Sequence, residues 1–436
     1  MDQMRHVYPI AGFLLWIALG SRPAGAQYTA NFQTNIISGV TSNWSGSYFV
    51  GGIADALVVE NGGVLNDGGA TVGNSFVATG DSVLVTGTGS VWSNNNRVFI
   101  GASGSGNSLV ISNGGYVLAL IDGAFVGENS GSNSNRVLVT DSGSVWDIRQ
   151  NFMLGQNGDN SSLVISNGGM VAVGESSFIG SAASSSNNNV LVTGSGSVWS
   201  NALSLDVGAS GGANSVVISN GGQVVDSTGY VGENSGSSNN AVRVVDGGVW
   251  QNNAVYVGYQ GSSNVLEVAG GSVGATNLTV GFSSALCNNL LQLDSGSVIV
   301  TNAAHTATLE VRHGALILDG GMLQTDTLVM TNSCAFFVHT SGTLIVGSVV
   351  LDPNTFRITS ITPQGDDLLI TWMMGPGATN ALQVTSGGAD GSYNTNGFSD
   401  IFIVTNNTTV GTVTNYLDIG AATNLPARYY RARLAP

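Results

Sequence analysis

The chain has 436 residues and a formal net charge of −15, with 26 acidic residues against 11 basic ones, all of them arginines. This balance disfavours binding to nucleic acid, whose phosphates attract clusters of lysine and arginine, and it suits a soluble exported protein. The composition is not that of a disordered chain, because valine, isoleucine, leucine and phenylalanine recur at regular intervals.

The first 26 residues are typical of a secretory signal. Arg5 and His6 precede the short apolar run IAGFLLWIALG, and the small residues AGA follow at 24–26. This order predicts cleavage before Gln27, and hence a secreted or cell-surface protein. An uncleaved anchor is the alternative, although the apolar run is short for a membrane span. We expect no transmembrane segment in the mature chain.

Two motifs alternate along residues 36–350. One is NSLVISNGGxV, which begins at Asn107, and the other is VLVTGSGSVWS, which begins at Val190. Each is followed by an apolar triplet that ends in glycine, and these glycines recur every 22 to 28 residues. A period in this range indicates a repeat architecture, in which each unit buries its apolar face against its neighbours.

Each repeat contains three short β-rich runs and no helical spacing of apolar residues. This pattern predicts an all-β fold: a parallel β-helix over residues 27–350, with three strands per coil and about twelve coils stacked at ~4.8 Å. We expect a right-handed coil, as parallel crossovers generally have. A β-propeller is the alternative, but the corners vary too much for regular antiparallel hairpins.

In the first strand of each coil, alternation assigns the middle of three apolar columns to the outer face. That column is aliphatic in seven successive coils and then reads Arg243, Glu267, Gln292 and Glu310. The aliphatic members are Val58, Leu84, Val110, Leu138, Val164, Leu191 and Val217. An outward stripe of this size indicates a binding surface. The alternative is that strand propensity alone favours these residues.

The third strand has an outward column as well, one residue before the aliphatic residue that precedes each glycine. Its aromatic members are Phe99, Phe125, Phe178, Tyr230 and Tyr256, and other levels carry Met153, Asp206 and Thr279. We expect these aromatic side chains to contribute to a binding surface.

Tryptophan recurs in every second coil, at Trp44, Trp92, Trp146, Trp199 and Trp250, and the last four each follow a valine. If the preceding residues (Val91, Val145 and Val198) face the core, the tryptophans face outward. The alternative is that they turn inward and fill corners of the core. Outward aromatic columns at regular spacing would suit stacking on sugar rings.

The glycine-flanked Asn113, Asn167 and Asn220 are expected at tight corners, because asparagine tolerates the left-handed conformation. Cys287 and Cys334 lie about two coils apart, roughly 10 Å at ~4.8 Å per coil. This is too far for a disulfide, so we expect both cysteines to be unpaired.

No catalytic or metal-binding constellation is apparent in the sequence. Acidic residues at the corners occur singly, whereas glycoside hydrolysis needs two facing carboxylates. The three late histidines stand at non-equivalent positions and suggest neither a metal site nor a triad. We expect no catalytic residue, no metal and no cofactor. A polysaccharide lyase or glycosidase remains the minority interpretation, and a calcium ion at an acidic corner remains open.

After Leu351 the period ends, and residues 351–436 contain about seven short strands, enough for a small β-sandwich. With Trp372 in an early strand and YYR at 429–431 in the last, this segment resembles a fibronectin type III-like module. The repeats SLVISNGG and VLVTGSGSVWS resemble the β-helical passenger repeats of bacterial autotransporters. The C-terminus departs from that family, because the segment is too short for the usual membrane barrel.

Together these features predict a non-enzymatic, secreted structural or adhesive rod. Its partner would be a second copy of itself, or a cell-surface or extracellular polysaccharide bound through the outward columns. The alternative is a carbohydrate-binding or polysaccharide-degrading β-helix protein.

Overall fold

The structure, a computed structural model, describes residues 28–332, 334–351, 357–374, 379–388, 392–393, 397–407, 412–423 and 427–435. The expected signal peptide at 1–26 lies outside the described residues. Within them every regular element is a β-strand. The all-β class predicted from the repeats is therefore confirmed.

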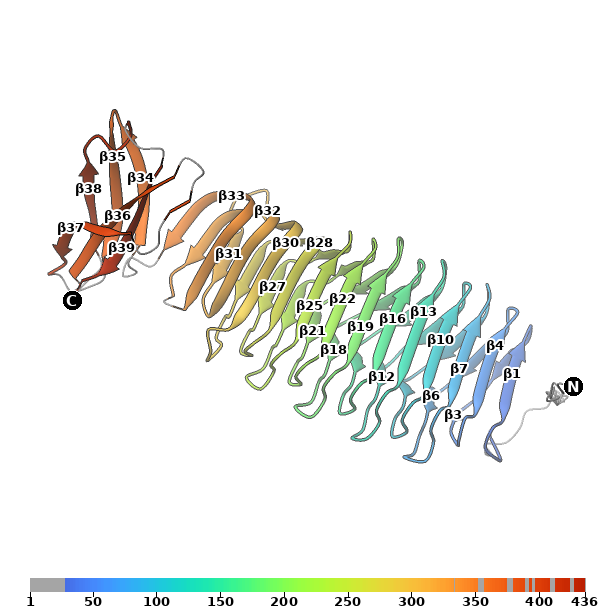
Figure 1. The fold of residues 1–436 in the computed structure, drawn as a ribbon. Helices are drawn as coiled ribbons and strands as arrows, with labels where there is room; N and C mark the ends of the chain where they lie inside the picture. The colour runs from blue at the N-terminus through green and yellow to red at the C-terminus, as the bar shows by residue number, and fades with distance from the viewer. Residues whose placement is uncertain are drawn as a thin grey trace, which may run out of the picture.

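A parallel β-solenoid of about 13 turns occupies most of the chain, one turn more than expected (Figure 1). Each turn of its first part contains three short strands, and each strand pairs in parallel with its equivalent in the next turn. The handedness of the coil stays a prediction.

The separate strands fall into three columns. The first column contains β1 (Thr34–Ser38), β4 (Ala56–Glu60), β7 (Ser82–Thr86), β10 (Ser108–Ser112), β13 (Arg136–Thr140), β16 (Ser162–Ser166), β19 (Asn189–Thr193), β22 (Ser215–Ser219) and β25 (Ala241–Val245). The second contains β2 (Thr41–Asn43), β5 (Val64–Asp67), β8 (Val91–Asn94), β11 (Tyr116–Ala119), β14 (Val145–Ile148), β17 (Met170–Val173), β20 (Val198–Asn201), β23 (Gln223–Val225) and β26 (Val249–Gln251). The third contains β3 (Ser47–Val50), β6 (Gly69–Val72), β9 (Val98–Ile100), β12 (Ala124–Val126), β15 (Phe152–Leu154), β18 (Ser177–Ile179), β21 (Ser204–Val207), β24 (Thr228–Val231), β27 (Ala254–Val257), β29 (Asn277–Val280) and β31 (Thr308–Val311).

In the last turns the corners between columns disappear. β28 (Val265–Ala275) and β30 (Asn289–Val300) each join the first two columns, because they pair with first-column and second-column strands along their lengths. β32 (Gly314–Met330) also pairs with β31, so it runs through all three columns, and β33 (Ala335–Leu351) pairs with it along its length, with register shifts around Asp319.

One continuous apolar core fills the solenoid from Tyr28 to Met330. It forms because alternate residues of every strand point inward. In the first column, for example, Leu109 and Ile111 are fully buried while Val110 between them is half-buried. Each turn therefore contributes a thin layer of aliphatic side chains that is buried only by the layers on either side.

The C-terminal residues form two three-stranded antiparallel sheets. The strands are β34 (Arg357–Gln364), β35 (Asp367–Met374), β36 (Thr379–Gly387), β37 (Ser399–Thr405), β38 (Thr412–Asp418) and β39 (Ala427–Leu434). The sheet orders are β34-β35-β38 and β37-β36-β39, and Trp372 of the first sheet packs edge-on against Phe402 of the second. The two sheets therefore share a small core, with six described strands where about seven were expected.

Candidate binding surfaces

The aliphatic stripe lies on the outer face of the first column, as predicted. Its seven members stack in register, so that Val110 pairs with Leu84 on one side and with Leu138 on the other. Ile36 of β1 pairs with Val58 and extends the stripe by one turn. Each member from Val58 to Val217 is half-buried, because the side chains of adjacent turns cover one another.

The stripe is one side chain wide. On one side it is flanked by hydroxyl groups that bond from turn to turn, such as Ser112 Oγ to Thr86 Oγ1 at 2.9 Å and Ser166 Oγ to Thr140 Oγ1 at 3.0 Å. On the other side the first residues of the strands are mostly serine, asparagine and alanine. The apolar surface is therefore a narrow ridge between two polar borders.

The stripe ends where the prediction placed its end. Arg243 and Glu267 follow Val217 in register and form an exposed ion pair of 2.8 Å. One assignment was wrong: Glu310 pairs with Thr279 and so belongs to the outer column of the third strands. Glu310, the last residue that the prediction assigned to this column, therefore lies on another face of the solenoid.

The aromatic column of the third strands also faces outward. Phe99 and Phe125 stack at 5.0 Å between ring centroids, and Tyr230 and Tyr256 stack at 5.3 Å. Phe178 belongs to the same column. All five rings are half-exposed.

Four of these five tryptophans do not face outward, and for them the prediction was wrong. Trp92, Trp146, Trp199 and Trp250 are fully buried in the core. The prediction placed the preceding valines in the core, and its register for these strands was therefore wrong by one residue. In the structure Trp92 pairs with Leu65 and Val117, and the preceding Val91 faces out. A slip of one residue moves every side chain of a strand to the other face.

Tryptophan alternates with smaller side chains inside the core, which leaves room for each indole. Trp146 lies between Val117 and Val171, and its ring contacts Phe152 edge-on at 5.4 Å. Aromatic pairs favour such edge-to-face geometry. These four tryptophans therefore stabilise the rod and are not available to a ligand, whereas Trp44 packs against the core and is only partly buried.

Two of the indoles donate to buried carboxyl groups. Trp92 Nε1 donates to Asp67 Oδ2 at 2.7 Å, and Trp250 Nε1 donates to Asp226 Oδ2 at 2.8 Å. Burial removes water from these carboxylates and raises the pKa of Asp67 to about 7 and the pKa of Asp226 to about 8. The hydrogen bond from each indole opposes that rise.

The asparagines predicted at tight corners are found there. Asn113, Asn167 and Asn220 have φ values of 52°, 52° and 51°. Their side-chain amides donate to threonine hydroxyls of the previous turn, for example from Asn113 to Thr86 at 3.1 Å. These residues therefore have a structural role at the corner.

A second asparagine series was missed, and it lies inside the solenoid. It lies immediately before each first strand, or at the first residue of β30, and is fully buried or nearly so: Asp55, Asp81, Asn107, Asn135, Ser161, Asn188, Asn214, Asn240, Asn264 and Asn289. We call it the amide ladder. Asn214 is typical, because its backbone N–H and its Nδ2 both donate to Asn240 Oδ1, at 2.9 and 3.2 Å. The asparagine that opens the NSLVISNGG motif was the available signal.

The amide ladder explains the glycine that ends most of the repeats. Gly101 has a φ of 75°, and a β-carbon at this position would lie 2.1 Å from Asn135 Nδ2. Only glycine tolerates both the backbone conformation and the close approach of the ladder. Seven of the regular glycines are therefore partners of a buried ladder amide, namely Gly73, Gly101, Gly155, Gly180, Gly208, Gly232 and Gly258.

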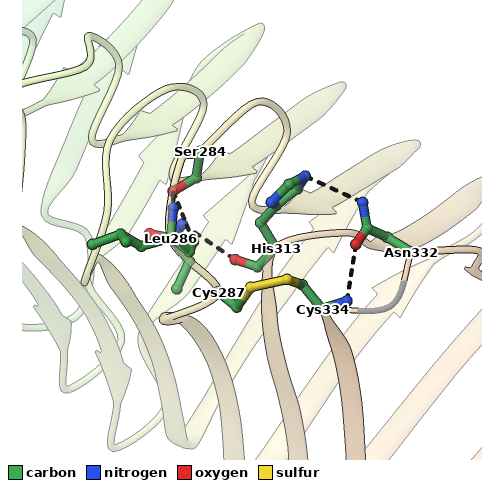
Figure 2. The surroundings of a disulfide bond; sticks show 7 residues. Ser284, Leu286, Cys287, His313, Asn332 and Cys334 are labelled. Atoms are coloured by element: carbon green, nitrogen blue, oxygen red, sulfur yellow. Dashed lines mark hydrogen bonds between the residues drawn. A yellow bond between two sulfur atoms is a disulfide. The ribbon is translucent and has the colours of Figure 1, made fainter.

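Cys287 and Cys334 form a disulfide, so the prediction that they are unpaired was wrong. Their Cα atoms lie 5.4 Å apart. Cys287 belongs to a loop between β29 and β30, and Cys334 to a corner between β32 and β33 (Figure 2). Because neither cysteine lies in a paired strand, the repeat of the solenoid does not fix their separation.

His313 lies beside the disulfide in the intervening turn. Its Nε2 is 3.2 Å from Asn332 Nδ2, and Asn332 Oδ1 accepts from the backbone N–H of Cys334 at 2.9 Å (Figure 2). The two sulfurs and one imidazole nitrogen lie within 4.8 Å of one another. As thiolates they would form a partial set of soft metal ligands, but in the disulfide the sulfurs have lost that capacity.

Among the described residues no helix is long and apolar enough to span a membrane. Comparison of the chain with family models, with curated proteins and with solved structures gave no match in any of the three.

Proposed function

We propose that this protein is a non-enzymatic, secreted structural or adhesive rod that associates laterally with a second copy of itself. The observation that carries the proposal is the stripe of aliphatic side chains. They lie in register on the outer face of the first-column strands from β1 to β22. Nothing within the described chain covers these half-buried side chains completely. Strand propensity alone also does not explain why Arg243 and Glu267 abruptly replace the aliphatic residues in this column.

A second copy fits this surface for two reasons. Two rods have the same repeat along their axes, about 4.8 Å per turn, so a ridge on one can contact an equivalent ridge over its whole length. The face is also nearly free of charge, since Glu60 and Arg136 are the charged residues in strands β1 to β22 of the first column. Two chains with a net charge of −15 can approach there with little repulsion.

We also propose that the repeats are related to the passenger repeats of bacterial autotransporters and that the C-terminal sheets are a fibronectin type III-like module. The parallel three-strand coil and the sheet pair around Trp372 support this proposal. Cell-surface or extracellular localisation follows from the expected signal at 1–26.

Sedimentation of the exported chain over a wide concentration range tests the association. We expect dimers or larger assemblies to form with rising concentration. The triple variant Leu84→Ser, Leu138→Ser, Leu191→Ser should remain monomeric, because it removes alternate members of the ridge. The matched control Thr86→Ser, Thr140→Ser, Thr193→Ser changes the same three strands but keeps the bordering hydroxyls, and it should assemble like the unmodified chain.

Thermal unfolding should show that both triple variants remain folded, since each change on a half-exposed strand position costs at most about 1 kcal/mol. A chain that stays monomeric at every concentration would contradict the proposal. So would a folded leucine variant that assembles as well as the control.

A further inference from the structure

The aromatic column of the third strands has a missing member at Asp206. Phe178 pairs with Asp206, and Asp206 pairs with Tyr230, in consecutive turns. Phe178 and Tyr230 are thus two turns apart, about 9.6 Å at ~4.8 Å per turn, with a short side chain between them. Elsewhere in this column the rings of adjacent turns stack at 5.0 and 5.3 Å.

The missing ring leaves a hollow on the outside of the rod. Its volume is about 370 Å³, and its lining includes Phe178, Leu203, Asp206, Thr228, Tyr230 and Glu233. A ring inserted at the level of Asp206 would lie about 5 Å from each flanking aromatic ring, the spacing that stacked rings adopt. The hollow therefore has the dimensions for one flat ring.

The floor of the hollow is an incompletely satisfied carboxyl group. Asp206 is only 2% exposed, and its Oδ2 accepts from Ser204 Oγ at 3.1 Å. Its Oδ1 is buried and has no hydrogen-bond partner among the described residues. A buried acceptor without a partner costs free energy, which a ligand that donates to it would recover.

The hollow is also short of positive charge. Burial, together with the charges of Glu233 and Asp226, raises the pKa of Asp206 to about 8, against the hydrogen bond from Ser204. Burial raises the pKa of Glu233 as well. No ion pair in the described part of the chain involves either Asp206 or Glu233. A cationic group would favour the ionised form of both carboxyl groups when it binds, and could lie against the face of Tyr230.

We propose that this hollow is a subsite for a ring that carries an ammonium group, namely one amino-sugar residue of a polysaccharide. Its pyranose ring takes the place of the missing ring between Phe178 and Tyr230. Its ammonium group donates to Asp206 Oδ1 and lies near Glu233. The hydroxyl groups of Ser204, Ser227 and Thr228 line the hollow and are available to the sugar hydroxyls. The proposal is independent of lateral association, which uses the first-column face.

Isothermal titration of the exported chain with a β-1,4-linked glucosamine tetramer at pH 6 tests the subsite. We expect binding that weakens at least tenfold for the N-acetylglucosamine tetramer, which keeps the ring and lacks the ammonium group. Asp206→Tyr restores the missing ring and should weaken binding of the glucosamine tetramer by a similar factor. Thermal unfolding should show this variant to be at least as stable as the parent, because it replaces a buried, partly unsatisfied carboxyl.

Glu128→Gln is the matched control. Glu128 follows the coil glycine as Glu233 does, but the ring of its turn, Phe125, stacks on Phe99 of the preceding turn, so no ring is missing there. Glu233→Gln should weaken binding and Glu128→Gln should not. Equal loss in the two variants would show only general attraction of a cationic oligomer to an acidic protein, and would overturn the proposal. It would also be overturned by equal affinity for the acetylated tetramer, by calcium chloride binding that Asp206→Tyr abolishes while the sugars do not bind, or by no binding at all.

Discussion

The side-chain amide of Asn240 occupies the space where a side chain on Gly208 of the adjacent turn would begin. A β-carbon on Gly208 would lie 2.1 Å from Asn240 Nδ2. The φ of Gly208 is 73°, which already disfavours any other residue. Most repeats thus combine two constraints in one residue, a left-handed backbone and contact with the amide ladder. The two can be separated experimentally, because other glycines of the rod have only the first constraint.

Gly208→Ala should destabilise the protein far more than Gly80→Ala. The φ of Gly80 is 72°, but no atom lies within 4 Å of the β-carbon position there. Gly80→Ala should therefore cost about 1–2 kcal/mol for the left-handed conformation alone. Gly208→Ala should cost several kcal/mol more, because the ladder must shift. Urea unfolding of both variants measures the difference, and equal losses would refute the explanation.

Asn188→Ala should destabilise the rod, whereas Asn189→Ala should change its stability little. Asn188 is fully buried, accepts from Ser161 N–H at 2.9 Å and donates to Asn214 Oδ1 at 3.1 Å. Its removal leaves buried polar groups unsatisfied, at about 1–3 kcal/mol for each. The adjacent Asn189 is exposed. Thermal unfolding of the pair tests the ladder, and a small effect at Asn188 would contradict it.

The stability of the protein should fall as the pH rises from 5 to 8. Asp67 and Asp226 bind a proton more tightly in the folded chain than in the unfolded one, because burial raises their pKa values to about 7 and about 8 from 3.8. Stability linked to these groups is therefore greatest below pH 4, declines as pH rises through the interval, and levels off above about pH 8. One pKa unit corresponds to about 1.4 kcal/mol, so the loss is on the order of several kcal/mol.

Asp226→Asn separates this effect from the general charge of the protein. Asparagine keeps an oxygen that can accept from Trp250 Nε1 and does not titrate. Melting temperatures recorded across the same pH range should decline less steeply in the variant than in the parent chain. Parallel profiles for the two proteins would exclude Asp226 as a source of the dependence.

Loss of the disulfide should weaken the end of the solenoid without affecting its beginning. The bond joins residues 47 positions apart, and closing a loop of such length stabilises a protein by about 2–4 kcal/mol. Because each turn contacts only its neighbours, hydrogen exchange in Cys287→Ser/Cys334→Ser should accelerate around β30 to β33. Exchange in β7 to β16 should stay as in the parent, and uniform acceleration along the rod would contradict this prediction.

The solenoid could be predicted from the sequence because apolar residues alternate in a regular way in each first strand. Leu109, Val110 and Ile111 illustrate this: the repeat and the later Arg243 together show which of the three faces out. The third strands gave the same result for Phe99 and Phe125. In both cases the register follows from residues whose polarity differs between turns.

The second strands lacked such a marker, and there the prediction failed. Val91 and Trp92 are both apolar, so the pattern does not decide which one faces the core, and a shift of one residue reversed the assignment. The amide ladder escaped notice for a related reason. Asparagine usually lies at the surface, so the sequence alone does not suggest that Asn188 is fully buried. Its burial is tolerated because its side chain forms a hydrogen bond with Asn214 in the next turn.

The disulfide could not be predicted from the repeat, because its two cysteines lie outside the repeating strands. Strand positions are set by the spacing of the turns, whereas Cys287 lies in a loop whose path depends on local contacts. The hollow at Asp206 was visible in the sequence only as an irregularity in an aromatic column. Its burial and its unpaired oxygen required the structure.

The stacking of turns also determines how the rod would respond to tension between its ends. The hydrogen bonds between turns run along the axis, so a pulling force would load them in series and open the turns one after another. A turn of 26 residues, such as that from Thr86 to Ser112, would add roughly 85 Å of chain at ~3.3 Å per residue. The rod would thus lengthen in steps and absorb work at each one. The disulfide links Cys287 to Cys334 covalently, so the segment between them cannot be stretched while the bond is intact. The turns nearest the C-terminal sheets would therefore be the last to open fully.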